Sequence, residues 1–197
     1  MYSIKEKTIS ELEINKSKFY CILYPLDNID SINEIINEVK AEYKGATHYC
    51  YAYIFDTIKR FNDDGEPGGT AGMPILNVLE NNNLDHILAI VVRYFGGIKL
   101  GAGGLVRAYT NSVTESLNKS NIIKLIQGYR IEIEFDYSNS KQIDYILKNY
   151  NIVDKKYSNN ISYIIDAPII DDIKSKLNNL IINYKVLDNI FIKVKED

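Results

Sequence analysis

The chain has 197 residues, of which 46% are hydrophobic and 25% are charged, values typical of a folded globular protein. The formal net charge of −3 argues against bulk attraction to nucleic acid, so any anion site has to be a local patch. The sequence contains no apolar run of the roughly 18 residues that a membrane helix needs, and its start lacks the apolar segment of a secretory signal. The two cysteines are too few for a disulfide framework, and together these features predict a cytoplasmic protein that does not bind a membrane.

The first two thirds of the chain alternate between strand and helix patterns. We predict strands at 3–14, 17–25, 48–55 and 86–94, and helices at 28–44, 73–82 and 103–118. The segment HILAIVVRY at 86–94 is almost continuously apolar, which predicts a strand buried on both faces. Residues 56–69 are expected to form a loop.

Composition changes after Gly128, because ten of the eleven glycines lie between Gly45 and Gly104 and none follows Gly128. The remainder predicts strands at 129–137, 151–158, 161–167 and 186–195, and helices at 139–149 and 169–183. This βαββαβ order is that of a ferredoxin-like fold. We therefore predict an α+β protein with two domains, 1–128 and 129–197.

The segment RYFGGIKLGAGGLVRAY at 93–109 contains what we call the first glycine loop, residues 95–104. A helix is predicted to start there, and free N–H groups at a helix start favour anions. The candidate residues for binding an anion or a partner are Arg93, Lys99, Gly101, Gly103, Gly104 and Arg107. The segment matches neither the P-loop nor the dinucleotide-binding pattern. Alternatively, the glycines only permit tight turns and close packing.

The second glycine loop, residues 62–74, reads NDDGEPGGTAGMP and is acidic. Its candidates are Asp63, Asp64 and Glu66, whose carboxylates could hold a hard cation, although the spacing of a calcium loop is missing. Two other interpretations stay open. The segment can be an exposed turn, or its carboxylates can pair with Arg93 or Arg107 and hold the two loops together. We predict no bound metal and no cofactor.

His48 and His86 each open a predicted strand, and either could be an acid–base group or a structural histidine. We keep His48 as a candidate of the second-loop site. No nucleophile is paired with a base at a recognisable spacing, so no catalytic residue is named and a non-catalytic protein is favoured.

Three long motifs occur in order: ATHYCYAYIF at 46–55, NDDGEPGGTAGMPILNVL at 62–79 and VVRYFGGIKLGAGGLVRAYTNSV at 91–113. In these motifs the chain resembles the YigZ/IMPACT family. The resemblance covers almost the whole chain, but its specific motifs lie within about 17–118. The family pattern assigns no catalytic roles. Its signature positions correspond to Asp63, Asp64, Glu66, Arg93, Lys99 and Arg107.

The resemblance implies a first domain like the second domain of a small-subunit ribosomal protein, with a left-handed βαβ crossover that breaks the usual rule. It implies a second domain like the C-terminal ferredoxin-like domain of elongation factor G. Eukaryotic relatives regulate translation under amino-acid starvation, which implies a binding protein that acts through RNA, the ribosome or a translation-associated protein.

Two further interpretations concern ligands. The alternative function is an enzyme or sensor that binds a small anion, such as a phosphorylated metabolite or a nucleotide, between the glycine loops. For RNA, aromatic residues on the strands of the second domain could form a stacking platform, or they could be core residues. These are Tyr129, Phe135, Tyr137, Tyr157, Tyr163 and Phe191.

Overall fold

A computed structural model describes residues 1–194, and their contacts divide them into two compact units. Unit 1 is Met1–Lys124, and unit 2 begins at Leu125. Helices and strands are mixed in both units, as expected of an α+β protein. The proposed domain boundary at Gly128 lies inside the long strand β7 (Ile122–Phe135) and stays a prediction. Among the described residues, no helix is long and apolar enough to cross a membrane.

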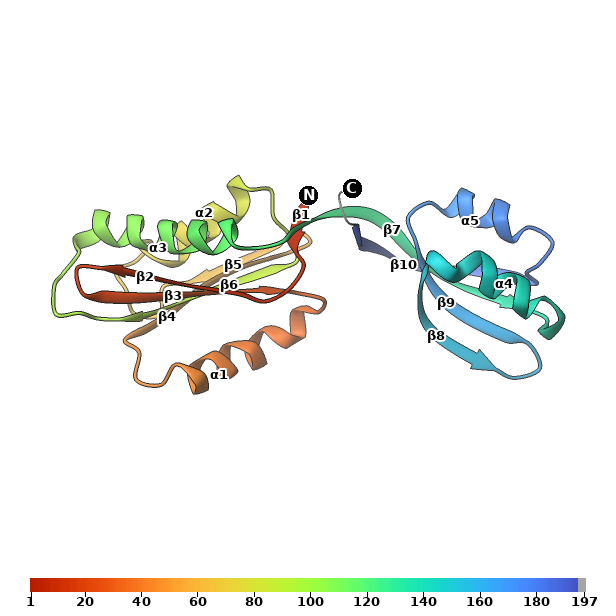
Figure 1. The fold of residues 1–197 in the computed structure, drawn as a ribbon, viewed down its shortest axis with the longest axis horizontal. Coiled ribbons are helices and arrows are strands. Elements are labelled where there is room, and N and C mark those ends of the chain that lie inside the picture. Colours follow the sequence, from red (N-terminus) through yellow and green to blue (C-terminus); the bar gives the residue numbers. More distant parts are fainter. Residues whose placement is uncertain (195–197) are drawn as a thin grey trace. The chain divides into compact units, whose positions relative to one another are not determined.

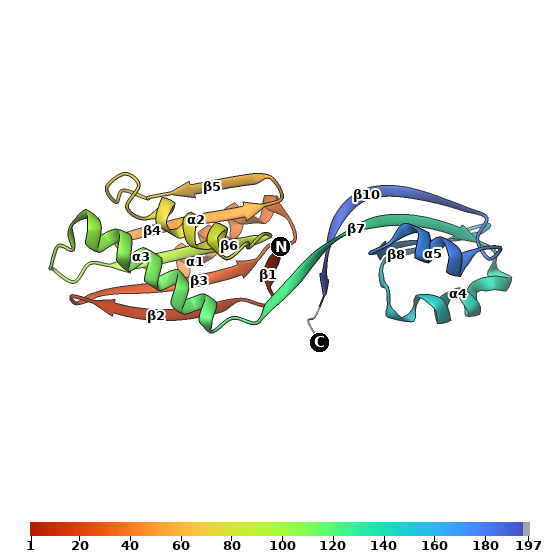
Figure 2. The same cartoon turned by 90° about the horizontal axis from the view of Figure 1, so that it is seen from above.

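Unit 1 is built on a five-stranded sheet with the order β2-β3-β6-β4-β5, in which all neighbours are antiparallel. Figure 2 shows β2 and β5 at its opposite edges. The strands are β2 Thr8–Ile14, β3 Ser17–Pro25, β4 His48–Phe55, β5 Ile58–Asn62 and β6 Ile87–Tyr94. Every residue of β6 before Tyr94 is buried, which confirms the strand predicted to be buried on both faces.

Helices cover both faces of this sheet (Figure 1). On one face lies α1 (Ile32–Glu42), preceded by a 3₁₀ turn; on the other lie α2 (Gly72–Asn81) and α3 (Gly101–Asn118). The apolar side chains of β6 alternate between the two cores. Leu88, Ile90 and Val92 belong to the core with α1, whereas Ile87, Ala89 and Val91 belong to the core with α2 and α3.

Two strand predictions in unit 1 need correction. The predicted strand 3–14 is two strands, β1 (Tyr2–Ile4), which pairs with the start of β7, and β2. The predicted loop 56–69 contains β5, which forms a hairpin with β4. All five residues of β5 are exposed, so the strand lacks the apolar alternation that sequence patterns detect.

Unit 2 contains the predicted βαββαβ order of elements, and its strands lie in the order β8-β9-β7-β10. After β7 come α4 (Ser140–Ile146), β8 (Asn151–Tyr157), β9 (Ile161–Ala167), α5 (Ile170–Leu177) and β10 (Asn183–Val194). Strand β7 begins seven residues earlier than predicted, and α5 ends six residues earlier. The predicted last strand extended to Lys195, which lies outside the described residues.

Two of the aromatic residues suggested for a stacking platform in unit 2, Phe135 and Tyr163, are not available for stacking on a ligand. Phe135 and Tyr163 are buried in the core and pack edge to face, with ring centroids 4.9 Å apart. On the opposite face of β7, Glu132 and Glu134 accept hydrogen bonds from Ser162 and Asn160. That interpretation was therefore wrong for these two rings, which are core residues.

Candidate functional site

Asp63 organises the second glycine loop. Its Oδ1 accepts hydrogen bonds from the backbone N–H groups of Ala71 (3.0 Å) and Gly72 (2.8 Å), and its Oδ2 accepts one from Gly69 (2.9 Å). Ala71 and Gly72 lie at the start of α2, where N–H groups have no partner inside the helix, and Gly69 lies in the loop before it. The carboxylate is therefore committed to closing the loop and capping α2.

Asp64 joins the same loop to β4. Its Oδ2 accepts a hydrogen bond from the backbone N–H of Tyr49 (2.7 Å), and its carbonyl oxygen lies 2.8 Å from His48 Nδ1. The oxygens suggested as cation ligands thus already accept N–H groups. Within residues 1–194, no group of three or more His, Cys, Asp and Glu side chains is placed to hold a metal ion.

Glu66 has the most buried carboxylate of the loop, with 3% of its side chain exposed. Its Oε1 accepts hydrogen bonds from Arg93 Nη1 (2.6 Å) and from the Tyr109 hydroxyl (2.8 Å). Its Oε2 lies 3.8 Å from His48 Nε2. The suggested pairing between an arginine and a carboxylate of the second loop is confirmed, and Arg93, not Arg107, is the partner.

Arg93 stands near the end of the central strand and is almost fully buried, with 6% of its side chain exposed. Its guanidinium lies between the rings of Phe19 and Phe95, 5.4 and 5.6 Å from their centroids. Beyond Glu66, the one other polar side-chain contact of the guanidinium within residues 1–194 is a long one, 3.5 Å from Nη2 to Ser17 Oγ, and Nε has no hydrogen-bond partner among these residues. A guanidinium has five N–H donors, so Arg93 keeps donors that the described side chains do not use.

Two buried residues complete this network, and the sequence analysis did not assign them to it. Cys50 Sγ lies 3.3 Å from the Tyr109 hydroxyl and 3.0 Å from the carbonyl oxygen of Asp63. Burial raises the pKa of the Cys50 thiol to about 12 and raises the pKa of the Tyr109 hydroxyl as well, so both stay protonated at neutral pH. In the sequence, Tyr109 falls on the same helical face as the apolar residues Leu105, Ala108 and Val113, so only its need for a polar partner when buried would have indicated the network.

The first glycine loop has close backbone packing at one end. A Cβ atom at Gly96 would overlap the backbone of Lys16 and Ser17, in the turn between β2 and β3. At the other end, Gly101 starts α3 in the left-handed region, with φ +68°. By contrast, a Cβ at Gly103 would meet nothing within 4 Å. The structural interpretation of the glycines therefore holds for Gly96 and Gly101, but not for Gly103.

The two glycine loops line one cavity of about 430 Å³, which we call the glycine-loop cavity. The second loop contributes Glu66 and Pro67, and the first contributes Phe95 and residues 99–102. The cavity also meets the start of α3, where Leu100 occupies the cap position and its side chain makes no capping hydrogen bond. Its lining residues are Thr47, His48, Glu66, Pro67, Arg93, Phe95, Lys99, Leu100, Gly101, Ala102 and Leu105.

The candidates from the sequence divide into two groups. His48, Glu66, Arg93, Lys99 and Gly101 line the cavity. The others do not: Asp63 and Asp64 hold the second loop, and Arg107 is exposed on α3, as is Gly103, whereas Gly104 is half-buried.

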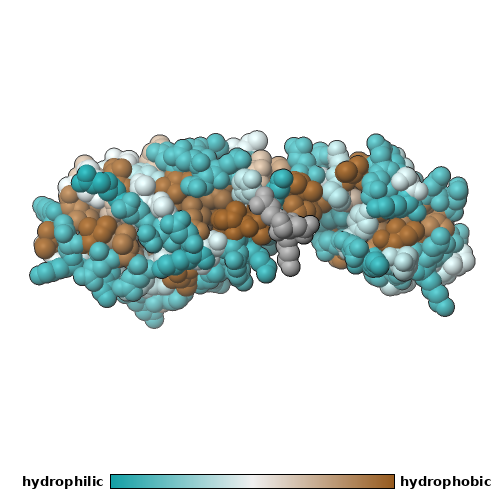
Figure 3. All heavy atoms as spheres, turned by 45° about the horizontal axis from the view of Figure 1, so that its top comes forward, coloured by the Kyte–Doolittle hydropathy of each residue, from teal (hydrophilic) through white to brown (hydrophobic). Residues whose placement is uncertain are grey.

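Apolar side chains are exposed beside the cavity. In Figure 3, apolar surface gathers at the left-hand end of unit 1, the end at which Figure 1 shows the loop before α3. The large apolar side chains exposed in that loop are Phe95 (46% exposed) and Ile98 (44%). The candidate site thus combines buried and exposed cations, an uncapped helix start and apolar surface.

Comparison with known proteins gives consistent results. Residues 15–117 match the Impact N-terminal domain. The chain is 40% identical over 167 residues to IMPACT family member YvyE of Bacillus subtilis, covering 82% of this chain and 77% of that protein. It is 42% identical over 112 residues to IMPACT family member YigZ of Escherichia coli, covering 54% and 55%. A crystal structure of a protein described as hypothetical is 26% identical, with a TM-score of 0.69 over 100% of this chain and 98% of that one.

Proposed function

The chain belongs to the IMPACT family, and from this premise we propose that it is a non-catalytic cytoplasmic protein that regulates translation by binding a protein of the translation machinery. We propose further that the partner inserts an acidic group into the glycine-loop cavity. The link to translation follows the family resemblance, in which eukaryotic relatives regulate that process. We also propose that unit 1 resembles the second domain of a small-subunit ribosomal protein, with a left-handed crossover. Unit 2 is proposed to resemble the C-terminal domain of elongation factor G.

The observation that carries the proposal is that Arg93 lines the cavity and has hydrogen-bond donors that the described residues do not use. Its guanidinium is buried, has one short ion pair, and retains donors without a described acceptor. Lys99 adds an exposed ammonium group to the same lining, and the start of α3 adds backbone N–H groups and the positive end of the helix dipole. These groups together favour a negatively charged ligand atom.

The neighbouring surface favours a protein over RNA. Proteins bind RNA largely by neutralising many phosphates, whereas the described residues of this cavity include only two cations, Arg93 and Lys99. Exposed Phe95 and Ile98 instead provide apolar surface of the kind that anchors a protein segment. The expected partner segment therefore carries an acidic side chain or a C-terminal carboxylate next to an apolar side chain.

Binding without catalysis agrees with the chemistry of the nearest nucleophile. Cys50 lies behind Glu66 and Tyr109, does not line the cavity, and has a pKa of about 12 because it is buried. Only the thiolate is a good nucleophile, and very little is present at neutral pH. The network around Glu66 is therefore assigned to holding Arg93 in place.

Co-sedimentation with ribosomes tests this proposal. We expect the chain to pellet with crude ribosomes of Bacillus subtilis, which contains a relative, at about 50 mM salt. Lys99→Glu should weaken binding about tenfold through repulsion of the acidic group, whereas Lys119→Glu, at the exposed C-terminal end of α3, should not. Lys99→Glu should leave any binding to protein-free ribosomal RNA unchanged. Failure to pellet would overturn the proposal, and weaker binding of Lys99→Glu to the free RNA would replace the protein partner with RNA.

A further inference from the structure

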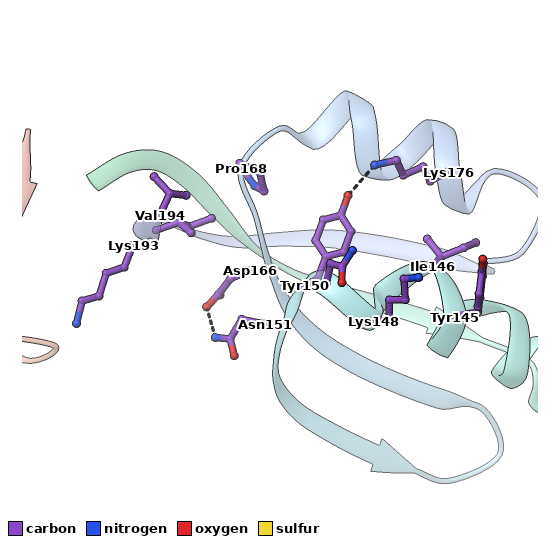
Figure 4. Close-up of a pocket in the computed structure, with 12 residues that line it drawn as sticks. Tyr145, Ile146, Lys148, Tyr150, Asn151, Asp166, Pro168, Lys176, Lys193 and Val194 are labelled. Carbon is purple, nitrogen blue, oxygen red and sulfur yellow. Dashed lines mark hydrogen bonds between the residues drawn. The ribbon is translucent and has the colours of Figure 1, made fainter. Parts of the chain in front are cut away.

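Unit 2 contains a cavity of about 670 Å³ that the proposed function does not use (Figure 4). The end of α4 and the 3₁₀ turn after it form one wall, and α5 and the end of β10 contribute others. This volume lies within the range of sites that bind small organic ligands. We call it the lysine–tyrosine cavity.

Its charge balance is positive. Three lysines contribute to the lining, Lys148, Lys176 and Lys193, and the carboxylate among the described lining residues is that of Asp166. That carboxylate is already balanced, because Arg130 donates to both of its oxygens, at 2.7 and 3.0 Å, and Asn151 donates to one. Lys176 is balanced in the same way by Asp172, so the positive charge that favours an anion in this cavity is that of Lys148.

The lysines differ in how they are held. Lys176 Nζ lies 2.6 Å from Asp172, one turn earlier on α5, and 3.1 Å from the Tyr150 hydroxyl. Lys148 Nζ lies 5.0 Å from the centroid of the Tyr145 ring, and no ion pair of the described residues includes it. Lys148 is thus the lysine best able to pair with an arriving phosphate.

Aromatic and apolar groups supply a second kind of contact. Tyr150 stands in the middle of the cavity with its hydroxyl directed to Lys176, and Tyr145 lies on α4 with 70% of its surface exposed (Figure 4). Ile146, Pro168 and Val194 add apolar lining. A nucleobase can stack on such tyrosines whichever base it is, because every base has a π-face.

We propose that the lysine–tyrosine cavity binds a nucleoside phosphate, with the base against Tyr145 and Tyr150 and the phosphate at Lys148. Three observations favour this ligand: the size of the cavity, its positive charge and its exposed aromatic surface. The same chemistry has two sources, a free mononucleotide or one nucleotide of an RNA strand. This inference is independent of the glycine-loop cavity, whose described lining lies wholly in unit 1.

Isothermal titration of the full chain tests the inference. The probes are AMP and UMP for the free ligand, a ten-nucleotide oligo(A) for the strand, and ribose 5-phosphate as the ligand without a base. We expect saturable binding of a mononucleotide or of the oligonucleotide, at least about tenfold tighter than ribose 5-phosphate because the base stacks. Tight binding of the oligonucleotide alone would assign the strand as the source.

Variants locate the binding. Lys148→Glu and Tyr145→Ala each change an exposed side chain, so the fold should survive, and each should weaken nucleotide binding about tenfold. Lys141→Glu changes an exposed lysine of α4 outside the cavity and should leave binding unchanged. The inference is overturned if no nucleotide binds at millimolar concentration, if ribose 5-phosphate binds as tightly, or if Lys148→Glu and Lys141→Glu behave alike.

Discussion

Arg93 lies where the central strand of unit 1 ends, and its buried surroundings make the fold depend on the carboxylate of Glu66. Glu66 forms its one short ion pair, and both side chains are almost inaccessible to water. A buried charge that loses its partner is left without either water or a counter-ion, which costs far more than the loss of an exposed pair. The pair therefore holds the second glycine loop against β6.

Glu66→Ala should destabilise the fold by about 3–5 kcal/mol, because it leaves the guanidinium of Arg93 buried without a counter-ion. The free energy of unfolding in urea measures this loss. The matched control is Glu80→Ala, which breaks the exposed pair with Lys59 and should cost about 1 kcal/mol or less. Equal losses in the two variants would show that the buried pair does not hold the loop.

The two thiols predict a loss of stability at high pH. Burial raises the pKa of Cys21 and Cys50 from 9.0 to about 12, so between these values the folded chain binds more protons than the unfolded chain. Stability is therefore unaffected by the thiols below pH 9 and falls as the pH rises above it, by about 1.4 kcal/mol per thiol per pH unit.

The measurement is the free energy of unfolding at pH 8 and at pH 10, for the wild type and for the double variant Cys21→Ala and Cys50→Ala. The wild type should lose about 3 kcal/mol more than the variant between these pH values. A loss of the same size in both proteins would mean that the thiols are not protonated in the folded state at pH 10.

Among the elements of the fold, both glycine loops lie where the sequence predicted them, but their glycines have different structural roles. The strand–loop–helix order of β6 and α3 was readable because a continuous apolar run gives way to glycines and then to a helical stripe. Which glycine is sterically required was not readable, since that depends on the turn between β2 and β3, about 80 residues earlier in the chain. The exposed strand β5 was missed because it has no buried face.

Gly96→Ala and Gly103→Ala separate these roles. A methyl group at position 96 would overlap the backbone of Lys16 and Ser17 and should cost about 2 kcal/mol or more. A methyl group at position 103, in α3, would meet nothing within 4 Å. It should stabilise the helix by about 1 kcal/mol, because alanine loses less backbone entropy than glycine. Thermal unfolding of the two variants should therefore shift in opposite directions. A higher melting temperature for Gly96→Ala would contradict the packing described for Gly96, and a lower one for Gly103→Ala would contradict the open space at Gly103.

For the whole molecule, the sequence predicted more of the fold than of the site. Periodicity was enough for the α+β class and for the element order of unit 2, since these depend on local patterns. The site depends on contacts between distant segments: Glu66 pairs with Arg93, whereas Arg107, just as basic and close to the loop, turns out to be exposed. Charge and spacing named both arginines as partners, and only packing distinguishes them. Cys50 and Tyr109 fitted apolar patterns and gave no sign of their polar contacts.

The central claim is that a protein of the translation machinery binds at the glycine-loop cavity, and photo-crosslinking from the edge of the cavity tests it most directly. The variant Phe95→p-benzoylphenylalanine places the reactive group at an exposed aromatic position of the lining, and Tyr157→p-benzoylphenylalanine in unit 2 is the control. With Bacillus subtilis ribosomes, position 95 should give a crosslinked product whose size ribonuclease does not change, and position 157 should not give it. A product from position 95 that ribonuclease reduces to nearly the size of the free chain, or equal products from both positions, would contradict the account.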